Sequence, residues 1–371
     1  MSAPPLFLGL DLAGTGTHPA SWRRADSRAE DVFGPAYWTE AVTRAERLGV
    51  DAVFLPDSFG LQPGGAGVTR GRLDAVAIAA RVAPLTRRIG LVPQVPVTHT
   101  EPFHVSKAIA ALDFASLGRA GWEVAVSGTS EEAKAFGRKD VQPVDSLWGE
   151  AEEAVEVVTR LWDSWEDDAE IRDVPTGRFI DRDRLHYIDF HGEHFSVKGP
   201  SITPRSPQGQ PIVTVRADDP AATEVAARRA DLIRVSAPDL AGAGDRRTAL
   251  RAAIATAGRD PDSVRVLLDL PVHLADSADR AHAEVAELDR WAGAETTAGI
   301  QHVGTAADLT ELLAEIAGSG NADGVVLRPL ALYATLAALP ERPARTGPPG
   351  TFRDQLALPR PASRYARGAA L

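Results

Sequence analysis

The chain of 371 residues contains no cysteine. This absence excludes disulfide bonds, thiolate metal sites and cysteine nucleophiles, and it leaves the redox compartment open. The sequence also lacks an apolar run long enough to cross a bilayer and the charged and apolar regions of a signal peptide, so we expect a cytoplasmic protein with no membrane partner. Clusters of lysine and arginine are missing as well. With a formal net charge of -11, binding to nucleic acid or to an anionic membrane surface is not expected.

Apolar strand-like runs alternate with amphipathic helical segments along the chain, and 44% of the residues are hydrophobic. This regular alternation predicts an α/β fold, a (β/α)8 TIM barrel that occupies residues 1–371 as a single domain. A doubly wound open sheet is the alternative, but the Gly-x-Gly-x-x-Gly loop expected after its first strand is missing. The eight expected strands span residues 6–10, 51–55, 89–92, 121–126, 212–215, 232–236, 264–270 and 324–327. The expected helices lie near residues 35–48, 73–82, 105–115, 145–165, 221–230, 245–257, 278–291 and 306–317.

Residues 167–210 interrupt this alternation after the fourth strand. The segment is rich in Asp, Arg, Gly and Pro, with short strand-like pieces at 186–190 and 194–197, and we interpret it as an inserted lid or hairpin. His186, His191 and His194 are spaced like metal ligands, but acidic residues alternate with them in a polar segment, so we predict solvated side chains and no metal site. Residues 340–371, rich in Pro, Arg and Gly, are expected to form an extended C-terminal tail.

The residues that follow each predicted strand are the candidates for function, because barrels place their chemistry at the carboxyl ends of the strands. His18 follows the first strand and is a candidate catalytic residue or an ordinary loop residue. Asp57, with Ser58, follows the second and either carries a role in the site or caps the next segment. Trp22 and Trp122 are interpreted as packing residues rather than stacking platforms. Further candidates at the strand ends are Thr98, Ser127, Arg216, Asp218, Asp219 and Arg328.

Several strings of sequence are specific enough to suggest a family. They include EPFHVSKAIAALDFASLGRAGW at 101–122 and HYIDFHGEHFSVKGP at 186–200, with further stretches at 16–26, 44–60, 160–169, 206–213 and 351–365. Together they resemble the bacterial-luciferase-like flavin monooxygenases, in the branch of the nitrilotriacetate, alkanesulfonate and dibenzothiophene-sulfone monooxygenases. The resemblance implies an oligomeric barrel that takes reduced FMN from a separate flavin reductase and uses O₂ to oxygenate a small organic substrate. In such an enzyme the candidate catalytic residues of this chain are His18 and Asp57, and the candidate cofactor contacts are Asp57, Ser58, Thr98, Glu123, Ser127, Arg216, Asp218 and Asp219.

The chain departs from that family at the positions expected to touch FMN. Where members usually read Gly-Trp-Asn after the fourth strand, this chain has Glu123, a carboxylate that needs a partner such as Arg119 or Lys107 to stay ionised when buried. Hydroxyl residues often follow the third strand in members, whereas Pro96 and Val97 precede Thr98 here. The Arg-Tyr that usually starts the fourth helix is replaced by Leu147-Trp148.

The largest departure follows the fifth strand, where members commonly read Gln-Ala-Gly-x-Ser and bind the FMN phosphate. This chain offers Asp218 and Asp219 instead, and a nearby carboxylate repels a phosphate by about 1 to 4 kcal/mol. Asp219 before Pro220 is also a typical helix cap, and Arg216 could neutralise one carboxylate or bind a phosphate itself.

Three hypotheses follow from the sequence. The first is an FMNH₂-dependent two-component monooxygenase with a remodelled flavin pocket. The second is a barrel that has lost FMN and serves as a non-catalytic partner or binding subunit, in a homo-oligomer or paired with a paralogue. The third is an enzyme of the same fold that uses a different flavin. The sequence does not indicate the substrate.

Overall fold

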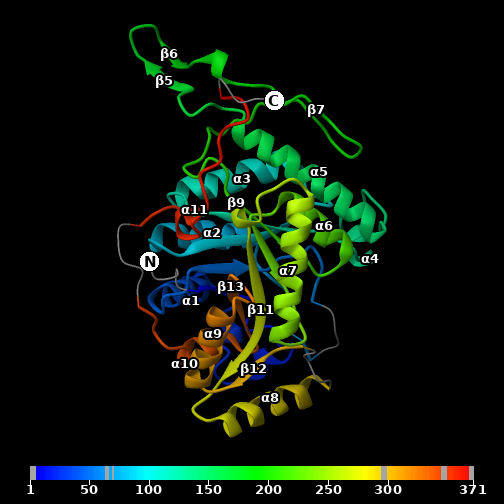
Figure 1. Cartoon of the computed structure of the whole chain (residues 1–371), viewed down its shortest axis with the longest axis vertical. Coiled ribbons are helices and arrows are strands. Elements are labelled where there is room, and N and C mark those ends of the chain that lie inside the picture. The colour runs from blue at the N-terminus through cyan, green and yellow to red at the C-terminus, as the bar shows by residue number, and fades with distance from the viewer. Residues whose placement is uncertain (1–5, 63–66, 69–70, 294–298, 344–348, 367–371) are drawn as a thin grey trace.

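The computed structural model describes residues 6–62, 67–68, 71–293, 299–343 and 349–366. Eight of the described strands run parallel and close into a ring, because β10 pairs with both β9 and β11. The predicted barrel is therefore confirmed (Figure 1). The ring is formed by β1 (Phe7–Asp11), β2 (Ala52–Leu55), β3 (Gly90–Pro96), β4 (Gly121–Ala125), β9 (Ile212–Arg216), β10 (Leu232–Val235), β11 (Arg265–Leu274) and β13 (Gly324–Pro329).

A short strand that the sequence did not predict, β12 (His302–Gly304), pairs with the extended end of β11. The longer helices between and after the barrel strands are α1 (Pro35–Arg47), α2 (Ala75–Val82), α3 (Pro102–Ala115), α5 (Val144–Asp163), α6 (Pro220–Arg229), α7 (Leu240–Thr256), α8 (Ala278–Ala292) and α9 (Ala306–Ser319). Short 3₁₀ helices span Ser21–Arg23, Ala29–Asp31, Ala83–Leu85, Arg182–Arg184 and Pro261–Ser263.

Helix caps explain where the helices differ from the prediction. α7 begins at Leu240 rather than at residue 245, because the Asp239 carboxylate accepts a hydrogen bond from the Gly242 amide and caps the helix. α4 (Ser130–Phe136) was not predicted, although Thr129 and Glu132 form a complete capping box at its start. Two further short helices, α10 (Leu332–Ala338) and α11 (Phe352–Gln355), lie near the end of the described chain.

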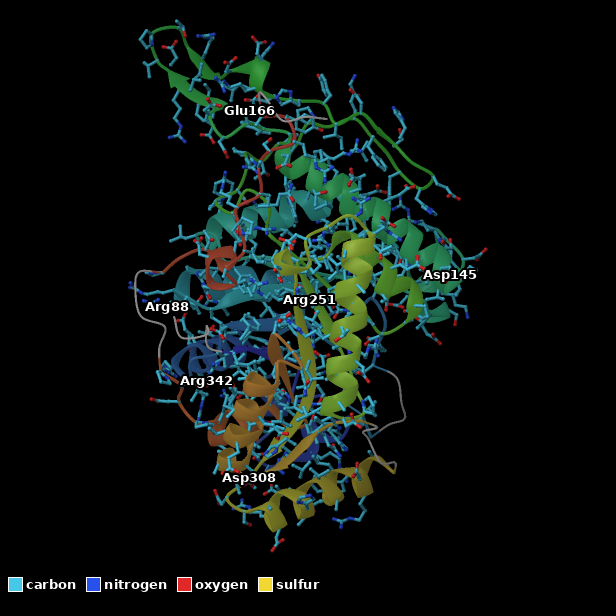
Figure 2. The ribbon with its side chains drawn as sticks, viewed as in Figure 1. Arg88, Asp145, Glu166, Arg251, Asp308 and Arg342 are labelled. Carbon is cyan, nitrogen blue, oxygen red and sulfur yellow. The ribbon has the colours of Figure 1, made fainter. Side chains whose placement is uncertain are left out.

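The segment between α5 and β9 forms two antiparallel hairpins rather than barrel structure. β5 (Glu170–Asp173) pairs with β6 (Arg178–Ile180) and projects beyond α5, and β7 (Phe190–His191) pairs with β8 (Ser196–Val197) (Figure 1). Glu166 lies at the hairpin end of the molecule, with Asp308 of α9 toward the other end (Figure 2). The Glu166 carboxylate contacts His186 Nε2 at 2.9 Å, and the His186 ring stacks on Tyr365.

The amino end of the barrel is closed by residues near the C-terminus. Phe352 of α11 is fully buried and joins Phe7 and Phe54 in one apolar cluster. The Phe352 ring leaves no room for a side chain at position 90, because a Cβ on Gly90 would meet it at 2.8 Å. The tail predicted over 340–371 is described here except for residues 344–348 and 367–371, which lie outside the described residues.

Candidate active site at the carboxyl end of the barrel

A buried ion network occupies the inside of the barrel near the carboxyl ends of the strands. Arg234 of β10 is 1% exposed and donates from Nε and Nη2 to the two carboxylate oxygens of Asp269, at 2.8 and 3.0 Å. Its Nη1 donates to Glu123 at 2.7 Å, and Nη2 also donates to Asp11 at 3.0 Å. One arginine therefore joins β1, β4, β10 and β11, which makes each carboxylate tolerable in the interior.

Two more arginines flank this network. Arg216 Nη2 lies 3.3 Å from Asp269 and 3.4 Å from Asp218, and Arg328 Nε lies 3.5 Å from Asp11. Burial raises the pKa of Glu123, and the guanidinium of Arg234 opposes that rise. Burial would also raise the pKa of Asp269, but Arg234 and Arg216 outweigh it and lower that pKa. The floor of the site is thus a charge-balanced layer of guanidiniums and carboxylates.

A cavity of about 430 Å³ opens above this floor, on the side of β1 and β13. Its walls are polar at the floor and apolar toward β2 and helices α1 and α2, where Val32, Trp38 and Ile78 are buried. We call this space the first cavity. The polar side chains that line it are Asp11, Thr15, Thr17, His18, Gln62, Arg72, Gln94, Glu123, Arg216 and Arg328.

A second cavity, also of about 430 Å³, adjoins the first and shares Gln94, Glu123 and Arg216 with it. It is bounded by the turn after β9, which carries Asp218 and Asp219. The Asp219 carboxylate accepts the Ala222 amide at 2.8 Å and the Trp148 indole N–H at 3.2 Å. The N-terminus of α6 is therefore already capped by a carboxylate, as the sequence predicted for Asp219.

His18 lies at the first cavity, whereas Asp57 lies elsewhere. The His18 ring is buried, with Nδ1 accepting the Ala20 amide and Nε2 lying 3.2 Å from Asp289. Burial lowers the pKa of His18, and Asp289 opposes this. Asp57 lines a neighbouring cavity between α2 and α3, and its carboxylate accepts the amides of Ser58 and Ala75. The structure places these two candidates in different cavities.

The remaining predicted residues are part of the loops around the site. Ser58 Oγ donates to the Gly60 carbonyl at 3.2 Å. Thr98 Oγ1 accepts the Ser127 amide at 2.9 Å and so joins the loops after β3 and β4. Both Thr98 and Ser127 are buried, and Thr98 lines a smaller cavity of about 220 Å³ with Lys139 and Glu150. These hydrogen bonds fix the loop conformations.

The partner predicted for Glu123 was wrong. Arg119 lies before β4, at the opposite end of the strand, where it donates to the carbonyl oxygens of Ala83, Thr86, Ile89 and Ser116. Lys107 is exposed on α3, and Glu123 pairs instead with Arg234. Closeness in the chain does not reveal this partner, because the barrel brings distant strands together. The sequence does hold a clue to this partner, since Arg234 and Asp269 are charged residues within mostly apolar strands and Asp11 ends another.

Comparisons with known proteins agree with this geometry. A sequence model of the luciferase-like monooxygenases matches residues 15–360. The chain belongs to the luciferase-like monooxygenase family. It is 35% identical to N-acetyl-S-(2-succino)cysteine monooxygenase of Bacillus subtilis (strain 168) over 76% of this chain and 64% of that protein. It is 32% identical to the dibenzothiophene-sulfone monooxygenase of Rhodococcus erythropolis over 70% and 59% of the two chains. The chain thus spans less than two thirds of the length of these relatives.

Other known proteins match along most of their length. One of the pristinamycin IIA synthase subunits of Streptomyces pristinaespiralis is 31% identical over 91% of this chain and 95% of that protein. The crystal structure of long-chain alkane monooxygenase shares the fold, with a TM-score of 0.85 over 96% of each chain at 20% identity. A riboflavin lyase solved with modified FMN and riboflavin has a TM-score of 0.82 over 95% of each chain at 24% identity.

The residues of the site fit the two ends of FMN differently. The adjoining cavities offer space and the Gln94 amide for a flat ring system. The phosphate end does not fit, because Asp218 and Asp219 present carboxylates and Asp219 already occupies the α6 N-terminus. Arg216, which lines the second cavity, already pairs with Asp218 and Asp269.

Within the described part of the chain, no three His, Asp or Glu side chains are grouped to hold a metal ion. His191 Nδ1 pairs with Ser196 Oγ at 2.9 Å on the β7–β8 hairpin. None of the described helices combines the length and apolar character needed to cross a membrane.

Proposed function

We propose that this chain is the oxygenase component of a two-component flavin-dependent monooxygenase. It would receive reduced FMN from a separate flavin reductase and use O₂ to oxygenate a small organic substrate. One observation carries the proposal: two adjoining cavities, each of a size that suits small ligands, meet at Gln94, Glu123 and Arg216 at the carboxyl end of the barrel. Family membership and the monooxygenase relatives support the reaction class.

In this proposal the protein positions the ligands, surrounds them with polar groups and excludes water from the site. The apolar wall of Val32, Trp38 and Ile78 keeps water from the first cavity. His18 is a neutral imidazole at neutral pH, because burial lowers its pKa, and it is held at the cavity by the Ala20 amide and Asp289. Asp57, Ser58, Thr98 and Ser127 are proposed to hold the loops that border the cofactor rather than to react.

Anaerobic titration with reduced FMN tests this proposal. Tryptophan fluorescence should be quenched on binding, since Trp38 and Trp148 line the two cavities, and the melting temperature should rise. The absence of both signals at high micromolar reduced FMN would rule out the oxygenase role.

A second candidate is a flavin-free subunit that pairs with a flavin-binding paralogue. The capped α6 N-terminus and its two aspartates favour it, because they oppose phosphate binding. The likeness to two different subunits of one enzyme, pristinamycin IIA synthase, is consistent with this role, since each is 31% identical to this chain. Co-expression with a paralogue should then yield a mixed oligomer. A purely homo-oligomeric product would count against this candidate.

A further inference from the structure

Three arginines at the first cavity have guanidinium N–H groups that lack hydrogen-bond acceptors among the described residues. Arg72, Arg216 and Arg328 all line this cavity, and the side chain of none of them donates a hydrogen bond to a residue that the structure describes. The Nε of each is buried without a hydrogen-bond partner among those residues. Arg216 and Arg328 make only ion pairs of 3.3 to 3.9 Å within the described chain. Arg234, directly beneath, is the contrast, because its Nε, Nη1 and Nη2 all donate hydrogen bonds.

Such unsatisfied donors favour an anionic ligand. A guanidinium has five N–H donors in a planar fork that matches a carboxylate, and leaving buried donors unpaired is costly. The cavity wall holds three guanidiniums against two carboxylates, those of Asp11 and Glu123. Each of these carboxylates already accepts a hydrogen bond from Arg234. The carboxylates near Arg216 and Arg328 balance their charge, so what the wall offers is buried guanidinium N–H donors that no described residue accepts.

The apolar part of the cavity wall favours an anion that carries a hydrocarbon group. Val32, Trp38, Leu55 and Ile78 are buried apolar residues on the side of β2 and the first two helices. A hydrated inorganic ion gains nothing from such a surface, whereas a hydrocarbon group is stabilised there because its apolar surface is removed from water. The cavity is thus lined by guanidinium groups at one end and by apolar side chains along one side.

We propose that the first cavity binds a small organic acid, with its carboxylate on Arg72 and Arg328 and its hydrocarbon part against Val32, Trp38 and Ile78. This assignment deepens the proposed function, on which it rests for the claim that the acid is the substrate. It names the substrate class as aliphatic or aromatic carboxylic acids.

Calorimetric titration of the native chain without flavin tests the assignment. Hexanoate should bind about tenfold or more tightly than hexanamide, which has the same shape without the charge, since hydrogen bonds from a guanidinium to a carboxylate are stronger than those to a neutral amide. Arg328→Gln should remove most of that preference. The matched control is Arg290→Gln on the surface of α8, which should leave hexanoate binding unchanged.

Equal binding of hexanoate and hexanamide would overturn the assignment, as would unchanged hexanoate affinity in Arg328→Gln. Displacement of hexanoate by an equal concentration of inorganic phosphate would also overturn it, because the site would then recognise charge alone. If Arg328→Gln does not fold, two measurements still test the assignment. One is hexanoate binding to Arg72→Gln, and the other is the comparison of hexanoate with hexanamide on the native chain. Because no flavin is present, a failure of flavin binding leaves this result intact.

Discussion

At the residue scale, Glu123 shows what can be predicted from the sequence and what cannot. Its position within β4 was predicted from the apolar pattern alone, and its difference from the asparagine usual in the family marked it as informative. Its partner could not be predicted, because Arg234 lies 111 residues further along the chain and meets it only when the barrel closes. Arg72 was missed for another reason: it follows a loop with no regular pattern.

Replacing Glu123 should be costly in a way that depends on the replacement. Glu123→Ala removes one partner of a buried ion pair and should lower the free energy of unfolding by about 3–5 kcal/mol. Glu123→Gln keeps an oxygen that can accept the Arg234 Nη1–H, so its loss should be smaller. Urea unfolding measures both, with Glu315→Ala on the exposed side of α9 as the control. Equal losses in Ala and Gln variants would contradict the expected role of this pair.

The aspartates after β9 give a second test. The double substitution Asp218→Ser and Asp219→Ser should tighten FMN binding by about 1 kcal/mol or more, because two carboxylates no longer repel the phosphate. Serine still caps α6, so the helix should be kept. Asp239→Ser, which alters an equivalent cap on α7, is the matched control. Weaker FMN binding in the double variant would mean that these aspartates help to hold the cofactor.

At the scale of elements, the strands and most helices follow directly from apolar periodicity. Short elements did not: α4, α10, α11 and the β5–β6 hairpin carry too few residues for a periodic pattern to stand out. The hairpins and the tail are instead held by charged contacts. Arg360 pairs with Asp167, and Arg364 pairs with Glu156 of α5 at 2.7 Å.

These contacts predict how stability depends on pH. Burial alone would raise the pKa of Glu156, but the guanidiniums of Arg364 and Arg160 outweigh it and lower that pKa to about 2 from its ordinary value of 4.5. A lowered carboxyl pKa contributes stability above the ordinary pKa, and that contribution is lost as pH falls from about 4.5 toward 2.

Urea unfolding at pH 5 and pH 3 measures this loss. Between these values the native chain should lose up to about 2 kcal/mol more than Glu156→Gln, which has no such carboxylate to protonate. Glu287→Gln, in an exposed pair on α8, should behave like the native chain. The same loss in Glu156→Gln as in the native chain would show that this contact is not the source.

At the scale of the whole molecule, the closed barrel was predictable because eight strand and helix units leave few alternatives, and its closure brings the carboxyl ends of all eight strands around one site. The ligand could not be predicted in the same way. It depends on which side chains from β1, β4, β9, β10, β11 and β13 meet inside the ring, and that pairing is a property of the closed barrel rather than of any one segment.

The central claim is that this site binds reduced FMN through its ring, with no favourable contribution from the phosphate. Parallel anaerobic titrations with reduced FMN and reduced riboflavin, followed by tryptophan fluorescence, test it most directly. We predict that both bind and that riboflavin binds at least as tightly as FMN. Tighter binding of FMN by about tenfold, equal to about 1.4 kcal/mol from the phosphate, would contradict this claim.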